Sequence, residues 1–296
     1  MLLVLLVIVI IMIITSVQHK TLDLPMPRLL CPSPPMGWNS WTCFATDINE
    51  QLIKDTVDAL IDKGLQQYEY VIVDDGWMDM SRDSNGDLQA CPVKFPSGMK
   101  ALGDYIHGKG FKFGLYTSVG GYTCEGYPGS FGHEEQDSKK FVEWGVDYIK
   151  LDWCTCKYVW WPFWNYRYRY ELFAQALHEH DVVIAMCNWG FGGSAHWGKE
   201  LAHTVRITFD VKPNEFMIQY IQRRGKALYH LGAVNGWNDL DSLEIGNGIS
   251  KNLAKWQMYW WSVLKSPLII GADVRTLDDE DVAILKTKSL IDYNQG

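Results

Sequence analysis

Several features that mark common classes of protein are missing from this sequence. No block of Lys and Arg interrupts a chain of net charge −8, so we expect no nucleic-acid partner. No Asn-x-Ser/Thr sequence occurs, so N-glycosylation is not expected. No Pro/Gly/Ser-rich linker divides the 296 residues, which gives no support to an arrangement of two small domains. Beyond the first residues, no stretch is apolar for long enough to span a membrane.

The N terminus carries the one long apolar run. Residues from Leu2 to Ile14 are apolar without interruption, a length typical of a signal-peptide core and short for a membrane span. We therefore predict a signal peptide or N-terminal anchor over residues 1–18, a leader segment over 19–33 and one main domain over 34–296. The expected destination is secretion, or a lysosome or vacuole. Anchoring to a membrane by an uncleaved signal is the alternative.

Cysteine and aromatic residues are plentiful. An exported chain with seven cysteines is expected to form disulfides and to keep at least one free thiol, although spacing alone does not pair them. Cys154 and Cys156 are not accompanied by a His cluster with ligand spacing, so we predict no metal there. The 14 Trp, 15 Tyr and 11 Phe residues mostly fill core volume, but such rings also stack on the apolar faces of sugars. The aromatic content therefore favours a carbohydrate ligand, though only weakly.

From residue 35 onward, short strand-like segments alternate with amphipathic helical ones. The strand-like segments are apolar at nearly every position, as in strands buried on both faces of a parallel sheet. They cover residues 70–73, 111–116, 146–151, 181–187 and 268–270. A helix is expected from a capping box of Asp47 and Glu50 to Gly64, and another from the cap Ser97 to Gly110.

The repeated strand–helix units allow an open doubly wound sheet or a closed barrel. An open nucleotide-binding sheet usually has a glycine-rich first turn, and none occurs here. About eight units follow the signal segment, which fits the roughly 250 residues of a typical barrel. We therefore predict the α/β class and a (β/α)8 TIM barrel.

Barrel enzymes place their active sites at the C-terminal ends of the strands, so the residues at those ends are candidates for function. The candidates are Trp38, Trp41, Asp74, Asp75, Tyr116, Lys150, Asp152, Asn188, Trp189, Arg206, Asp210, Asp239 and Asp241. Taken singly, each Asp could be a turn or helix cap, each Trp could be packing, and Asp74 with Asp75 could ligate Mg²⁺ or Ca²⁺. The coincidence of carboxylates at four strand ends favours a site.

Two carboxylates at one cavity suit glycoside hydrolysis, in which one attacks the anomeric carbon and the other protonates the leaving oxygen. Lys150 precedes Asp152 by two residues in a strand, so both side chains point to the same face. A nearby ammonium lowers the pKa of a carboxylate, which keeps a nucleophile ionised. Adjacent carboxylates such as Asp74 and Asp75 can hold two sugar hydroxyls through charge-assisted hydrogen bonds.

A series of motifs at these residues closely resembles glycoside hydrolase family 27, which contains α-galactosidases (melibiases) and α-N-acetylgalactosaminidases. The motifs occur in order from about residue 34 to the C terminus. They are P-M-G-W-N-S-W (35–41), D-D-G-W (74–77), S-R-D-S-N-G (81–86), F-P-S-G (95–98), K-F-G-L-Y (112–116), P-G-S-F-G-H-E-E-Q-D (128–137), W-G-V-D-Y-I-K-L-D (144–152), G-W-N-D-L-D (236–241) and S-P-L-I-I-G-A-D-V-R (266–275).

The resemblance implies a retaining exo-glycosidase that releases terminal α-linked galactose from oligosaccharides or glycoconjugates. Asp152 would be the nucleophile and Asp210 the acid/base. Asp74 and Asp75 would bind the 4- and 6-hydroxyls of the sugar, with Trp41 packing on its ring. The other sugar-contacting positions are Tyr116, Lys150, Arg206 and Asp241. The family uses no metal and no cofactor, and Cys124 with Cys154 matches one of its disulfides.

The sequence departs from the family pattern at the residue that contacts the sugar 2-hydroxyl. Family α-galactosidases usually have Glu there, whereas this chain has Asn188, which can still donate and accept at a hydroxyl. Galactose remains the expected sugar, and α-N-acetylgalactosamine is the alternative. The retained Asp74–Asp75 pair argues against a β-L-arabinopyranosidase. An inactive sugar-binding homologue is a further alternative, which the retention of Asp152 and Asp210 disfavours.

Two further departures concern the scaffold. Gly76 stands where the family usually has Cys, and Thr46 lies near the place of its partner cysteine, so we expect one family disulfide to be absent. The chain also stops at residues 292–296, where a C-terminal antiparallel β domain would begin in the family. We therefore expect a barrel that lacks this domain, or an incomplete gene product. Apolar surface that the domain normally covers would favour association, for example as a homodimer.

Overall fold

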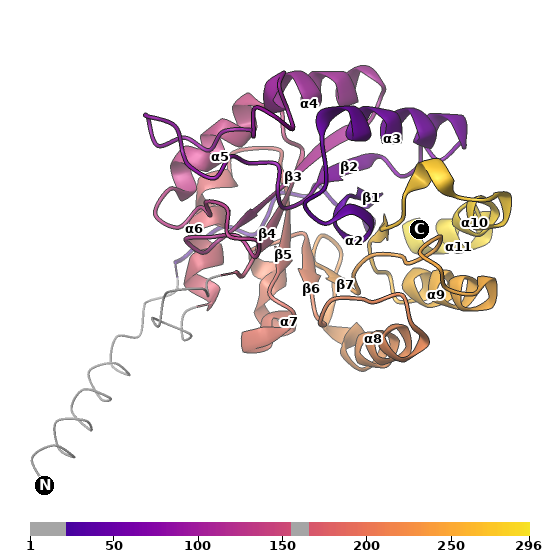
Figure 1. Cartoon of the computed structure of the whole chain (residues 1–296). Helices are drawn as coiled ribbons and strands as arrows, with labels where there is room; N and C mark the ends of the chain where they lie inside the picture. Colours follow the sequence, from indigo (N-terminus) through magenta and orange to yellow (C-terminus); the bar gives the residue numbers. More distant parts are fainter. Residues whose placement is uncertain (1–21, 155–165) are drawn as a thin grey trace, which may run out of the picture.

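Eight parallel strands, surrounded by helices, form the centre of the computed structural model, which describes residues 22–154 and 166–296 (Figure 1). The strands are β1 (Met36–Asn39), β2 (Tyr70–Val73), β3 (Lys112–Ser118), β4 (Tyr148–Asp152), β5 (Val183–Cys187), β6 (Thr204–Arg206), β7 (Trp237–Asp239) and β8 (Leu268–Ile270). Each pairs in parallel with its neighbours in the order β7-β6-β5-β4-β3-β2-β1-β8. The predicted (β/α)8 barrel is confirmed.

The ring closes through the residues that follow β7. Leu243 donates its backbone N–H to the carbonyl of Ile269 at 2.7 Å and accepts from Gly271 at 3.0 Å, which ties the end of the β7 segment to β8. The helices outside this ring are α2 (Trp41–Phe44), α3 (Glu50–Asp62), α4 (Gly98–Gly108), α5 (Glu134–Glu143), α6 (Tyr166–Leu177), α7 (Ser194–Trp197), α8 (Glu215–Leu228), α9 (Lys251–Val263), α10 (Asp279–Leu285) and α11 (Lys288–Gln295).

The start of α3 differs from the predicted capping box. Asn49 is the cap, since it has an extended backbone and its side-chain oxygen accepts from Leu52 N at 2.9 Å. Glu50 is the first helical residue, and its carboxylate pairs with Lys54 and accepts from Ser97 N at 3.0 Å. The prediction of Asp47 and Glu50 as reciprocal caps was therefore wrong. Ser97 does precede α4, but its side chain makes no capping hydrogen bond, and its backbone N–H is donated to Glu50.

Packing inside the barrel closes its N-terminal end. Side chains from β2, β4, β5 and β8, among them Tyr70, Tyr148, Val183 and Ile269, form a buried cluster in the lumen. Gly37 on β1 is required beside this cluster, because a Cβ there would lie 2.5 Å from the carbonyl oxygen of Tyr70. With the lumen filled below, a ligand can enter the barrel only from the C-terminal ends of the strands.

The described part of the predicted leader lies against the barrel. Leu30 and Cys31 donate their N–H groups to Asn235 Oδ1 at 3.1 and 3.0 Å, and Trp237 Nε1 donates to the carbonyl of Cys31 at 2.9 Å. Residues 22–33 therefore belong to the packed structure at the closed end. The predicted signal segment, residues 1–18, lies outside the described residues. Within those residues, no helix has both the length and the apolar character needed to cross a bilayer.

One buried ion pair joins two of the sequence motifs. Both Nη atoms of Arg82 donate to the two carboxylate oxygens of Asp137 at 2.7 Å, and they also donate to the carbonyls of Gly86 and Gly129. Asp137 lies in the first turn of α5 and is fully buried. The S-R-D-S-N-G loop is thereby fixed to α5, which leads into the catalytic strand candidate β4.

We expect Arg82→Ala to destabilise the protein by about 3–5 kcal/mol, because it leaves a buried carboxylate and two carbonyls unpaired. Urea unfolding followed by circular dichroism measures the change. Lys139→Ala is the matched control, since it removes an exposed cation that pairs with Glu135 on the same helix α5. Equal unfolding midpoints for Arg82→Ala and Lys139→Ala would show that the buried pair contributes no more than a surface pair.

Candidate active site

A pocket of about 240 Å³ opens at the C-terminal ends of the strands. Each of the eight strands, or the segment that follows it, contributes to its wall. Of the predicted site residues, those that line it are Trp41, Asp74, Asp75, Tyr116, Lys150, Asp152, Trp189, Arg206, Asp210, Asp239 and Asp241. The volume lies below the 300–1,000 Å³ of sites for drug-sized ligands, which suits one small ring better than a chain.

Asp152 is the last residue of β4 and is 5% exposed. Its Oδ1 accepts from the backbone N–H of Trp153 at 2.7 Å. Burial raises the pKa of Asp152 to about 6, while Lys150 opposes this shift. Above that pH the group is ionised and can act as a nucleophile.

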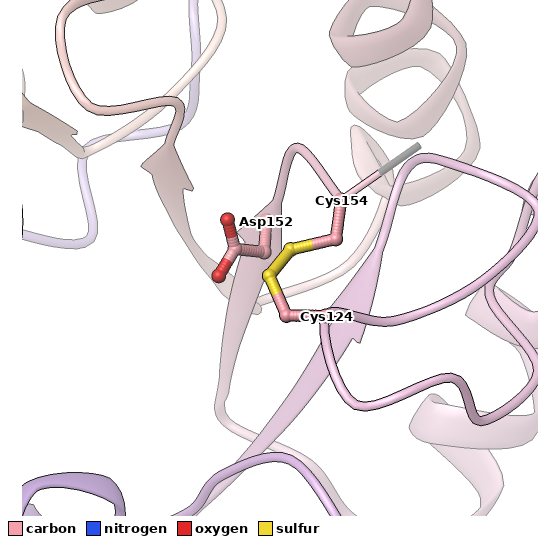
Figure 2. Close-up of side chains that lie close together, drawn as sticks. All are labelled: Cys124, Asp152 and Cys154. Carbon is pink, nitrogen blue, oxygen red and sulfur yellow. A yellow bond between two sulfur atoms is a disulfide. The ribbon is translucent and has the colours of Figure 1, made fainter. Parts of the chain in front are cut away.

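A disulfide between Cys124 and Cys154 lies beside Asp152 (Figure 2), and Cys124 also lines the pocket. Cys154 follows Asp152 by two residues, and Cys124 comes from the loop after β3, so the bond ties that loop to the end of β4. One potential ligand atom from each of the three residues lies within 4.8 Å of the others. Because the two sulfur atoms are bonded to each other, they do not offer the thiolates that a metal would need.

Asp74 lies in a network of donors at the end of β2. Its Oδ2 accepts from Lys150 Nζ at 2.8 Å and from Asn39 Nδ2 at 2.7 Å. The ammonium of Lys150 also lies 5.1 Å from the centre of the Tyr116 ring. These contacts hold the Asp74 carboxylate in one orientation at the pocket wall, where it can accept hydrogen bonds from hydroxyl groups.

Asp75, the next residue, is held by backbone donors. Its Oδ2 accepts from Glu125 N at 3.1 Å and its Oδ1 from Gly76 N at 2.8 Å. Burial raises the pKa of Asp75 to about 7, although these hydrogen bonds oppose the shift. A Cβ at Gly76 would lie 2.9 Å from Thr46 Cβ, so the two positions at which the sequence predicted an absent disulfide are in contact.

Arg206 connects the carboxylates on the other side of the pocket. This residue of β6 is 3% exposed, donates to Asp210 Oδ1 at 2.8 Å and also pairs with Asp241. Asp210 has a side chain 48% exposed and also accepts from Trp189 Nε1 at 3.1 Å. Burial raises the pKa of Asp210, but the charges of Arg206 and Lys150 outweigh it and the pKa is lowered. Asp210 is therefore a carboxylate before any ligand binds.

Asn188 is not among the residues that line the pocket. Its side chain is fully buried, and its Nδ2 donates to the carbonyl of Phe191 at 2.9 Å. Its Oδ1 has no hydrogen-bond partner within the described residues. Trp189 has a left-handed backbone, φ 56°, and this turn brings Cys187 and Trp189 to the pocket on either side of Asn188. The predicted sugar-contacting position is thus displaced into the turn.

Some pocket residues were not selected from the sequence. Cys187 of β5 lines the wall, as does Glu125 from the loop that carries Cys124. Cys187 follows Ala185 by two residues on β5, and the period of a strand could have identified it. No signal in the sequence pointed to Glu125.

Glu244 is a buried acid behind the pocket wall. It is fully buried, its Oε2 accepts from Asn247 Nδ2 at 2.8 Å, and its Oε1 has no partner within the described residues. Burial raises the pKa of Glu244 to about 7, with a smaller contribution from the Asp241 charge. A carboxyl group that must lose its proton in this environment destabilises the folded state as pH rises.

We expect Glu244→Gln to stabilise the protein relative to the wild type as pH rises from 4.5 to about 7.5. In the unfolded chain Glu ionises near pH 4.3, whereas in the folded protein Glu244 keeps its proton to about pH 7. Its contribution to the free energy of unfolding is therefore fully present below pH 4.3 and is lost as pH rises through about 7. The amide of Gln has the same shape and does not ionise, so the variant's stability does not fall in this way. The free energy of unfolding of Glu244→Gln should therefore exceed that of the wild type by about 2–3 kcal/mol at pH 7.5. Urea unfolding at both pH values measures it. Glu280→Gln, an exposed carboxylate on α10, reports the general effect of removing one negative charge. A pH-independent difference for Glu244→Gln would contradict the raised pKa.

The comparisons with known proteins agree with the family suggested by the motifs. The family model described as Alpha galactosidase A matches residues 33–296. The Alpha-galactosidase of Cyamopsis tetragonoloba is 37% identical over 270 residues, which cover 89% of this chain and 64% of that protein. Alpha-galactosidase 3 of Arabidopsis thaliana is 40% identical over 271 residues, which cover 90% and 61%. The chain thus spans less than two thirds of the length of these two relatives.

Solved structures give the same result. The α-galactosidase of Saccharomyces cerevisiae with raffinose superposes with a TM-score of 0.84 at 37% identity, covering 89% of this chain and 64% of that one. Alpha-galactosidase I of Mortierella vinacea superposes with a TM-score of 0.84 at 34% identity, covering 90% and 73%. Together with the motifs, these matches show that the chain belongs to the Alpha galactosidase A family, which is glycoside hydrolase family 27.

Proposed function

We propose that this protein is a retaining exo-α-galactosidase that removes terminal α-linked galactose from oligosaccharides or glycoconjugates. The observation that carries the proposal is the placement of Asp152 and Asp210 on the wall of one small pocket with a closed floor. Asp74 and Asp75 face the same pocket from β2 and offer two fixed carboxylates for sugar hydroxyls. The raffinose in the yeast structure supports raffinose-type oligosaccharides as candidate substrates.

The proposed reaction proceeds in two displacements. An Asp152 oxygen attacks the anomeric carbon while Asp210 gives its proton to the leaving oxygen, and the glycosidic bond breaks to leave a galactosyl ester on Asp152. Asp210 then takes a proton from water, whose oxygen attacks the same carbon and releases Asp152. Two inversions give a product of unchanged anomeric configuration.

The charges of the pocket suit a change of protonation between the two steps. For the first step Asp210 must hold a proton, and a bound glycoside favours this because it excludes water from the half-exposed carboxyl group. Arg206 remains paired with Asp241 when Asp210 is protonated. Ester formation then removes the negative charge of Asp152, which otherwise raises the pKa of its neighbours, so Asp210 becomes the stronger acid and returns to its carboxylate form.

Roles for the remaining predicted contacts follow from their positions. We propose that Asp74 and Asp75 accept from the 4- and 6-hydroxyls, that Trp41 packs on the ring, and that Tyr116, Lys150, Arg206 and Asp241 orient the sugar. These residues all line the pocket. A contact from Asn188 to the 2-hydroxyl would require its buried amide to leave the Phe191 carbonyl. Discrimination between galactose and N-acetylgalactosamine is therefore proposed to rest on Cys187 and Trp189, which line the pocket beside it.

We also propose that residues 1–18 direct the chain to the secretory route. Their apolar composition is typical of a signal peptide, and the Cys124–Cys154 disulfide is consistent with an oxidising compartment. Association into a homodimer stays a prediction. No bound metal or cofactor is needed for the two-carboxylate reaction as proposed.

We expect the purified chain to hydrolyse an aryl α-galactoside faster than the aryl α-N-acetylgalactosaminide. Asp152→Asn removes the nucleophile and should reduce kcat by at least about 10³-fold, since the ester can no longer form. Asp181→Asn, at the opposite end of the barrel, is the control and should keep wild-type activity, because Asp181 pairs with the exposed Arg28 far from the pocket. A folded wild type that cleaves neither substrate contradicts the enzyme proposal, and faster cleavage of the acetamido sugar contradicts the specificity.

We expect Asp210→Asn to behave differently from Asp152→Asn. An aryl leaving group needs little protonation, so this variant should form the galactosyl ester and then hydrolyse it slowly. Added azide should rescue turnover and give α-galactosyl azide, because azide attacks the ester from the face that water would use. Asp152→Asn with azide should instead give the β-azide by a single displacement. The NMR coupling of the anomeric proton distinguishes the two, and a β-azide from Asp210→Asn would reverse the assigned roles.

A further inference from the structure

Three aromatic rings from the loops after β5 and β6 form a continuous apolar surface at the mouth of the pocket. We call Trp189, Phe191 and Phe209 the aromatic rim. The ring centroids of Trp189 and Phe191 lie 6.2 Å apart and those of Phe191 and Phe209 lie 5.7 Å apart, both edge to face. Trp189 lines the pocket, whereas Phe191 is 45% exposed and Phe209 49% exposed. The rim therefore begins in the pocket and continues onto the outer surface.

The position of the rim relates it to the leaving group. Trp189 Nε1 donates to Asp210 Oδ1 at 3.1 Å, and Phe209 directly precedes Asp210 in the chain. A general acid must lie within hydrogen-bond distance, about 2.6–3.2 Å, of the oxygen that it protonates. If Asp210 is that acid, as proposed above, the leaving group departs past Asp210 and meets the rim next.

The aromatic rim offers apolar contact and no free hydrogen-bonding group on its rings, which determines the kind of leaving group that it can bind. Phenylalanine side chains have no donor or acceptor, and the indole N–H of Trp189 is already donated to Asp210. A leaving sugar could stack one apolar face on a single ring, but its hydroxyls would find no hydrogen-bond partner among the three rings. An alkyl chain has no hydrogen bonds to water to lose and, when extended, can contact all three rings in turn.

We propose that the aromatic rim binds the leaving group of the substrate and that it selects α-galactosides whose leaving group is an alkyl chain. This inference rests on the proposed α-galactosidase function and names the class of substrate that the function would prefer. The binding is apolar and non-covalent, so it adds contact area to the reaction without adding a chemical step.

The test uses methyl, butyl and octyl α-galactosides, each below the concentration at which it forms micelles. Their leaving alcohols are of similar acidity, so the chain length changes contact with the rim and leaves the bond-breaking chemistry alike. We expect kcat/KM to rise about tenfold from methyl to octyl, which corresponds to about 1.4 kcal/mol. In the Phe191→Ala/Phe209→Ala double variant the octyl-to-methyl ratio should fall below about twofold.

Phe216→Ala provides the control, because Phe216 on α8 is 77% exposed and lies outside the rim. It should keep the wild-type ratio. Thermal unfolding of each variant checks that it is folded. Both Phe side chains of the rim are half exposed, so their truncation should leave the melting temperature close to that of the wild type.

The other outcomes are distinguishable. Wild-type cleavage of all three galactosides with equal kcat/KM overturns the inference and leaves the proposed function intact. An unchanged ratio in the double variant also overturns it, and if sedimentation then shows loss of a dimer, the rim is an interface between two copies of the chain. Absence of cleavage of any α-galactoside by the folded wild type overturns both the inference and the proposed function.

Discussion

The structure depends on how a pocket with a closed floor accommodates many carboxylates beside few cations. Seven carboxylates line the pocket, and Lys150 and Arg206 are the only cations that line it in the described part of the chain. Burial alone would protonate most of these acids. Lys150 pairs with Asp74 and opposes the effect of burial on the pKa of Asp152. Arg206 pairs with Asp241 and, together with Lys150, lowers the pKa of Asp210.

The barrel supplies the conditions for this balance. Filling the lumen at the N-terminal end gives the pocket a closed floor of buried side chains, and burial strengthens the charge interactions above it. The same burial makes the acids a source of instability, since Asp75 and Glu244 hold protons to about pH 7 in the folded state. The carboxylate of Asp137, placed away from the pocket, avoids this cost because Arg82 pairs with both of its oxygens. Function and stability thus make opposite demands on buried charge in one domain.

Much of the fold and of the site could be predicted because both depend on local patterns. Strands such as β2 and β8 are fully buried and therefore apolar throughout, and their bounds were found to the residue. The barrel rule then placed the strand-end carboxylates together. Details that depend on contacts between distant segments could not be predicted. Asn49 caps α3 while Glu50 accepts from the backbone of the distant Ser97, and Glu244 is fully buried although no motif marks it.

Asn188 shows the same limit at the site itself. Its position in the sequence matches the family residue that contacts the 2-hydroxyl, but a side chain's direction depends on the backbone of its turn. The left-handed residue Trp189 and the hydrogen bond from Asn188 to the Phe191 carbonyl turn the amide away from the pocket. A motif therefore identifies a position along the chain, whereas the neighbouring turn determines whether that position reaches the ligand.

The division of the pocket between elements explains how specificity could change while the chemistry is kept. Asp152 owes its environment to β2, β3 and β4 through Asp74, Lys150 and the Cys124–Cys154 disulfide. Asn188 and the aromatic rim belong to the loops after β5 and β6, which carry no lumen packing of their own. Substitutions in those loops alter what lies beside Asp210 without moving Asp152. The sequence of such loops can change while the barrel stays the same, because the hydrogen bonds between the strands end before the loops begin.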